Sequence, residues 1–82
     1  MSTIDGTLET VANESFLIPK DGGAEVHLVM RNMPPGGDFD ERSAAATAYL
    51  TETVGAHDSD PITVNGDSLN PHVFLVDSAQ LR

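Results

Sequence analysis

The most regular alternation of apolar and polar residues lies between positions 24 and 32. Every second residue there is apolar, namely Val26, Leu28 and Met30. Because successive side chains of a strand point to opposite faces, this alternation predicts a β-strand whose second face carries His27, Val29 and Arg31. A short apolar segment at positions 16–18 precedes it. The glycine-containing stretch at positions 20–23 supplies a turn between them, so we predict a hairpin.

The first fifteen residues carry two conflicting patterns. Ile4, Leu8 and Val11 have the spacing of one helix face. Gly6 and the threonine-rich stretch at positions 7–11 are typical of a strand instead. We favour the strand.

One helix is predicted over residues 39–54. Asp38 can cap its first turn, and Glu41 follows three residues later, which is the spacing of a capping box. Gly55 stands where a helix commonly ends in a left-handed residue. The preceding stretch at positions 33–37, which contains Pro34 and Pro35, is predicted to be a loop.

After the helix, the pattern predicts a polar loop at positions 56–61 and a short strand at positions 62–64. Asn65-Gly66 is a strong tight-turn signal, and positions 67–69 are expected to return as the partner strand. Four consecutive apolar residues follow: Val73, Phe74, Leu75 and Val76. Such a run predicts a strand that is covered on both faces, in the middle of the sheet or at a subunit contact. Positions 77–82 are expected to be a tail.

These elements indicate a single α+β domain over residues 1–82. We expect a small, mostly antiparallel sheet of four to five strands, with the one helix packed on one face. One helix cannot cover such a sheet, so the other face is expected to be polar or covered by a partner. The chain has no cysteine, so disulfides cannot add to a core that is small at this length.

The charge of the chain narrows its partners. Thirteen acidic residues stand against four basic ones, which gives a formal net charge of −9. Nucleic acids and anionic membranes repel such a chain, so neither is an expected partner. The acids are scattered along the whole sequence and form no acidic tail. Few lysines, many aspartates and abundant alanine, valine, threonine and glycine are typical both of adaptation to high salt and of a GC-rich genome. The N-terminus resembles no signal peptide, so we expect the cytoplasm or a virus particle as the location.

Three residues of the loop at positions 56–61 form the most site-like cluster. His57, Asp58 and Asp60 could bind a divalent cation weakly. The calcium-loop pattern fails, however, because the next ligand position holds Ile62 and the position that requires glycine holds Thr63. We therefore interpret the cluster as a solvated turn and expect no metal and no cofactor.

A second acidic group precedes and opens the predicted helix. Asp38, Asp40 and Glu41 could in principle supply the two carboxylates of a glycosidase, but helix capping already accounts for them. The histidines, including His72, lie far apart in the sequence, and no serine stands in a nucleophile-elbow pattern. These observations favour a protein that is not an enzyme.

Two further classes of function remain. The first is a protein–protein interaction module, such as a small acidic subunit of a virion or multi-protein complex, whose function depends on self-assembly or on a protein partner. Its predicted contact residues are the apolar run and the proline loop: Val73, Phe74, Leu75, Val76, Pro34 and Pro35. The alternative is an acidic inhibitor that imitates nucleic acid and occupies a basic site on another protein. That role requires carboxylates in a continuous row, whereas dispersed acids favour the first class.

Overall fold

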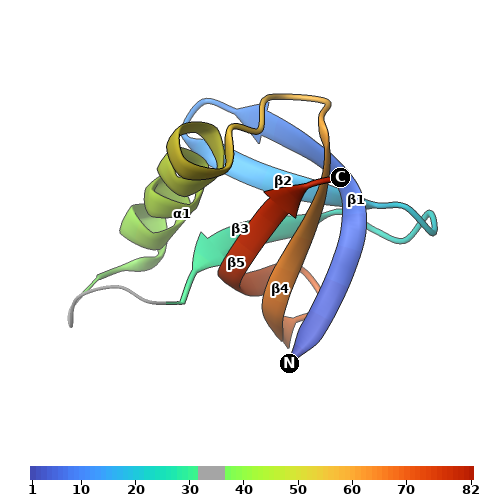
Figure 1. The fold of residues 1–82 in the computed structure, drawn as a ribbon. Coiled ribbons are helices and arrows are strands. Elements are labelled where there is room, and N and C mark those ends of the chain that lie inside the picture. Colours follow the sequence, from blue (N-terminus) through green and yellow to red (C-terminus); the bar gives the residue numbers. More distant parts are fainter. Residues whose placement is uncertain (32–36) are drawn as a thin grey trace.

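The computed structural model describes residues 1–31 and 37–82 (Figure 1). Its strands and helices follow one another along the chain as β1 Ser2–Val11, β2 Glu14–Pro19, β3 Val26–Met30, α1 Phe39–Ala48, η1 Tyr49–Val54, β4 Pro61–Asn70 and β5 Val73–Leu81. η1 continues α1 directly with wider, π-type turns, so the helical segment covers the predicted residues 39–54. The prediction of four to five strands and one helical segment is therefore confirmed, with five strands observed.

The five strands form a closed barrel in the order β1-β2-β3-β5-β4, and β4 pairs back onto β1. All neighbours are antiparallel except β3 and β5, which are parallel. Closure depends on β1, which pairs with β4 through residues 2–7 and with β2 through residues 6–11. Gly6 lies where these pairings overlap, and a Cβ there would overlap the carbonyl oxygen of Ile18. A glycine at this position lets the strand bend between its two partners.

The hydrophobic core lies inside the barrel. Its largest fully buried side chains come from all five strands and η1: Leu8, Leu17, Leu28, Leu50, Ile62, Val64, Phe74 and Val76. α1 packs mainly against β3 and β2 and adds Ala46 to this core. The helix therefore closes one end of the barrel, away from the β2–β3 turn (Figure 1). We expected an open sheet with a helix on one face; closure of the barrel replaces that open sheet.

The helix begins and ends at the residues that the sequence predicted. Asp38 is the N-cap, and its carboxylate accepts a hydrogen bond of 2.8 Å from the backbone N–H of Glu41. Gly55 ends the helical segment with a φ of 80°, in the left-handed region. Arg42 ties the helix to the end of β3, because its guanidinium donates to the carbonyl oxygens of Met30 and Arg31 at 3.0 and 2.8 Å.

The predicted turn at Asn65-Gly66 is wrong. β4 runs through these residues, with a shift of register between them. A Cβ on Gly66 would overlap the carbonyl oxygen of Leu75, so this glycine permits close approach of β5 rather than a chain reversal. The reversal occurs at residues 71–72, and the predicted tail after Val76 instead continues β5 to Leu81.

Two other expectations met different outcomes. Residues 2–11 form the strand that the sequence favoured. The apolar run of β5 is not covered equally on both sides, because Phe74 and Val76 point into the barrel while Val73 and Leu75 lie half-buried on its outside. In the described part of the chain, no helix has both the length and the apolarity to cross a membrane.

Candidate docking face

The outer surface of β1, β2 and β3 is the candidate functional site. Antiparallel pairing places Glu9 of β1 beside Phe16 of β2, and Phe16 beside His27 of β3. The same register places Thr7 beside Ile18 and Val11 beside Glu14. These side chains point outward because their neighbours Leu8 and Leu17 fill the core. We call this surface the docking face and define it as Thr7, Glu9, Val11, Glu14, Phe16, Ile18 and His27, together with Phe39 at the start of α1.

Three rings form the centre of the docking face. The ring of His27 lies 4.7 Å from that of Phe16, centroid to centroid, with 35° between the ring planes. Phe39 meets the other side of His27 at 5.0 Å, nearly edge-on at 88°. Nε2 of His27 lies 2.7 Å from the hydroxyl oxygen of the buried Ser43 on α1. These contacts fix the imidazole in orientation and join the sheet to the helix.

Large apolar side chains on this face remain exposed to solvent. Val11 is 54% exposed, Phe39 43% and Ile18 40%. Single exposed apolar residues are ordinary on protein surfaces, but a contiguous group is typical of a contact surface. Phe16 connects the group, since Ile18 lies two residues along the same strand and Val11 lies diagonally across the β1–β2 pair. Phe39 joins it through the ring of His27.

The docking face carries two carboxylates and no lysine or arginine. Its carboxylates belong to Glu9 and Glu14, and within the described structure no cation lies within ion-pair distance of either. The three arginines make their contacts elsewhere. Arg42 holds backbone carbonyls at the end of β3, and Arg82 donates to the carbonyl oxygen of Gly6 at 3.2 Å.

Arg31 forms an ion-pair network on the outside of the barrel. It pairs with Asp67 of β4, and its Nε lies 2.8 Å from a carboxylate oxygen of Asp77 on β5. Two hydrogen bonds hold the pKa of Asp67 below its ordinary value of 3.8. The one from Arg31 contributes most, and the one from the amino group of Met1 contributes second most. The hydrogen bond with Asp67 likewise raises the pKa of Arg31. The network links the end of β3 to β4 and β5. Arg31 therefore stabilises the barrel and does not belong to the docking face.

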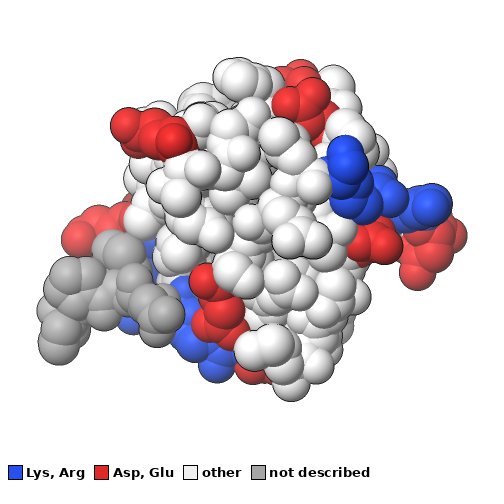
Figure 2. All heavy atoms as spheres, viewed as in Figure 1, with Lys and Arg blue, Asp and Glu red and all other residues white. Residues whose placement is uncertain are grey.

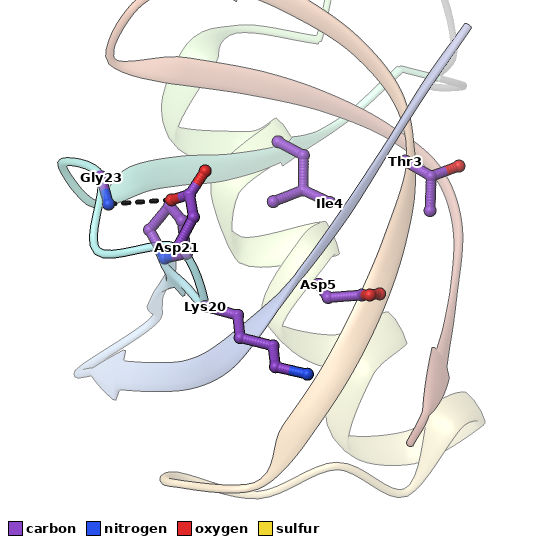
Figure 3. A pocket seen from close by; sticks show the side chains of 7 residues that line it. Thr3, Ile4, Asp5, Lys20, Asp21 and Gly23 are labelled. Carbon is purple, nitrogen blue, oxygen red and sulfur yellow. Dashed lines mark hydrogen bonds between the residues drawn. The ribbon is translucent and has the colours of Figure 1, made fainter.

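An open hollow of about 660 Å³ lies at the end of the barrel away from the helix. Figure 3 shows Thr3, Ile4 and Asp5 of β1 on one side of it, and the β2–β3 turn with Lys20 and Asp21 on the other. Its two carboxylates already accept hydrogen bonds, that of Asp5 from the hydroxyl of Thr63 and that of Asp21 from the backbone N–H of Gly23. The hollow thus offers one amine and two carboxylates that already accept hydrogen bonds, and this set of groups indicates no particular class of ligand.

The structure divides the contact residues predicted from the sequence. Phe74 and Val76 are fully buried inside the barrel. Val73 and Leu75 reach the outer surface, and Val73 pairs with His27, which places it at the border of the docking face. Pro34 and Pro35 lie outside the described residues.

The candidate metal ligands make local contacts within their turn. A carboxylate oxygen of Asp60 accepts the backbone N–H of His57 at 2.8 Å, and Asp58 accepts that of Thr10 at the same distance. Asp58 therefore anchors the loop to β1. Across residues 1–31 and 37–82, no three histidine or acidic side chains gather in a geometry that could hold a metal ion.

The remaining candidate groups are separated in space or otherwise engaged. Asp38 caps the helix, while Asp40 and Glu41 extend from its exposed first turn. His27, His57 and His72 lie on β3, in the loop before β4 and in the turn before β5. Carboxylates occur on every strand except β3, on both helical elements and in the loops, and the face seen in Figure 2 shows them as separate patches with uncharged surface between them.

The aromatic centre is the feature that reasoning from the sequence missed. A usable signal existed, because the register of the predicted hairpin places Phe16 opposite His27. Phe39 carried no such signal, since its approach to His27 depends on how the helix crosses the end of the barrel.

A five-stranded closed barrel with a helix between its third and fourth strands is the arrangement of the OB fold, whose members bind ligands on the face of strands 2 and 3. No family model, no curated protein and no solved structure matches this chain. Since one fold supports many functions, the function has to be argued from the docking face itself.

Proposed function

We propose that this protein is a non-enzymatic protein–protein interaction module, a small acidic subunit or accessory component of a larger assembly. The observation that carries the proposal is the docking face. It combines exposed apolar side chains with carboxylates, and no lysine or arginine belongs to it. Aromatic residues at the centre of a patch and charges at its border are typical of protein interfaces.

The charge of this face argues for a protein ligand instead of a nucleic acid. OB folds that bind nucleic acid use basic grooves and stacking aromatic side chains. Phe16, His27 and Phe39 could stack with bases, but Glu9 and Glu14 would lie beside the phosphates and repel them. A protein surface with apolar and basic groups would complement both the exposed apolar side chains and the carboxylates of the docking face.

The dispersal of the remaining carboxylates favours a subunit over an inhibitor that imitates nucleic acid. Such an inhibitor presents acids at regular spacing along one continuous row. On the docking face, Phe16 and Ile18 interrupt the carboxylates, and the other acids are spread over β1, β4, β5, both helical elements and the loops. General solubility accounts for these scattered charges.

Site-specific photo-crosslinking tests the proposal. A photoreactive amino acid at position 18 is compared with one at position 80, where exposed Gln80 lies on β5 of the opposite wall. In the native cell, we expect one protein to crosslink from position 18 and not from position 80. The purified partner should then bind the wild-type chain, and I18S should weaken binding while Q80S leaves it unchanged.

Equal crosslinking from both positions, or equal binding by the I18S and Q80S variants, would contradict the proposal. A partner that loses nucleic-acid binding in the complex would support the inhibitor instead. Amide NMR spectra of both variants verify that the barrel is intact.

A further inference from the structure

A groove extends the docking face along the helix. It has a volume of about 450 Å³ and lies between the β1–β2 turn and α1, with Glu14 on the first wall and Asp40 on the second. Its remaining lining is uncharged: Ala12, Asn13, Ser43 and Ala44. The groove thus brings together two carboxylates from segments that are distant in the sequence.

The groove is continuous with the aromatic centre. Glu14 and Phe16 lie two residues apart on the same outward face of β2, and Asp40 follows Phe39 on α1. Ser43, which lines the groove, is also the hydrogen-bond partner of His27. An occupant of the groove would therefore contact both carboxylates and Ser43, the residue that joins the groove to the ring of His27.

We infer that the docking face binds a basic segment of a partner protein, with an arginine side chain of that segment in this groove. A guanidinium is planar and weakly hydrated, pairs with carboxylates through two hydrogen bonds and stacks on aromatic rings. Glu14 and Asp40 supply the carboxylates, and the residue next to Asp40 in the sequence, Phe39, has an exposed ring. This inference rests on the proposed function and names the chemistry of the partner.

Charge complementarity selects this occupant over the others. A second copy of the chain carries the same net charge of −9, so it would be repelled. The arginines of the chain itself are held at other places, Arg31 by Asp67 and Asp77 and Arg42 by carbonyl oxygens. The other two cations of the chain also lie elsewhere, Arg82 at the carbonyl oxygen of Gly6 and Lys20 at the hollow beside the β2–β3 turn, so the cation proposed for the groove comes from another protein.

NMR titration of the isotope-labelled chain with two short peptides tests the inference. Both are acetylated and amidated repeats, one of arginine and glycine, the other of the neutral isostere citrulline and glycine. The arginine peptide should shift the amide signals of residues 12–16 and 39–44 and the ring signals of His27, and the citrulline peptide should not. A lysine version should bind more weakly, because an ammonium lacks the planar geometry.

Two matched double variants distinguish the effect of the groove carboxylates on peptide binding from the effect of the net charge of the chain. E14Q/D40N removes both groove carboxylates, and E41Q/E52Q removes two exposed acids outside the groove. The first should weaken binding of the arginine peptide by about tenfold and the second by about twofold or less. F39A should also weaken binding, without any change in net charge.

Equal weakening by both double variants, or equal binding of the citrulline peptide, would overturn the inference. The proposed function has a separate outcome. Crosslinking from position 18 together with failure of the arginine peptide would retain the docking face and reject arginine as its ligand. Failure of both experiments would reject the face as a whole.

Discussion

The barrel has two contrasting regions, the wall formed by β4 and β5 and the docking face on β1, β2 and β3. They differ in the ion pairing of their acidic side chains and in the regularity of their strand pairing. β4 and β5 pair over most of their lengths, with two shifts of register. On this wall, Asp67 and Asp77 have Arg31 as their partner. The docking face has regular pairing, and its carboxylates lack an ion-pair partner among the described residues.

This difference separates groups that hold the barrel together from groups left for a ligand. A side chain of the β4–β5 wall should change the free energy of unfolding when it is replaced. A side chain of the docking face should change binding while leaving that free energy nearly unchanged. Each of the following substitutions tests this separation.

Replacement of Gly66 by alanine should have the largest effect. The new Cβ would overlap the carbonyl oxygen of Leu75, so the register shift that joins β4 to β5 could not form unaltered. We expect a loss of about 4 kcal/mol or more in the free energy of unfolding, which is most of the stability of a domain this small. Urea unfolding followed by circular dichroism measures it.

G23A is the matched control, because a Cβ at Gly23 meets only a flexible side-chain oxygen of Asp21, at 3.2 Å. It should cost less than about 1 kcal/mol. A G66A chain as stable as the G23A chain would show that β4 and β5 tolerate a different register.

Phe74 and Leu75 are neighbours in the sequence that lie on opposite sides of the wall. Phe74 is fully buried in the core, whereas Leu75 is half-buried outside. F74A should lower the free energy of unfolding by about 3–5 kcal/mol, and L75A by about 1 kcal/mol, because only the first leaves a cavity. Equal losses in urea unfolding would mean that the outer side of β5 is as well packed as the core.

The sequence predicted those parts of the fold that depend on local chemistry. Asp38, Glu41 and Gly55 act within a turn of the helix they begin or end, so their spacing was enough to locate it. Gly66 was misread as a turn residue because the reason for this glycine is β5, which no local pattern reveals. The same limit applies to Phe39, whose contact with His27 exists only after the barrel has closed.

Arg31→Gln should change how stability depends on pH. Because Arg31 holds the pKa of Asp67 below its unfolded value, the ion pair stabilises the fold fully above about pH 4, and this contribution is lost as the pH falls through the folded pKa. R31Q should lower stability at neutral pH and flatten its decrease below pH 4. The effect should be smaller than that of F74A, since these side chains are partly exposed and screened by solvent.

Thermal unfolding at a series of pH values measures this dependence. K20Q removes the same charge from the β2–β3 turn and should leave the slope as in the wild type. A K20Q profile that matches R31Q would attribute the effect to net charge, and the contrast between the two regions would then lose its electrostatic part.

Ser43→Ala should have the smallest effect on stability and the sharpest effect on the docking face. It removes the hydroxyl that lies 2.7 Å from Nε2 of His27, at a cost of about 1 kcal/mol. The imidazole should then lose its fixed orientation, which ring nitrogen and proton chemical shifts report directly. T51V, which removes a hydroxyl bonded only to carbonyls within the helical segment, is the control. Unchanged His27 signals in S43A would show that Phe16 and Phe39 alone hold the ring, and that the helix contributes to the docking face by packing and not by hydrogen bonding.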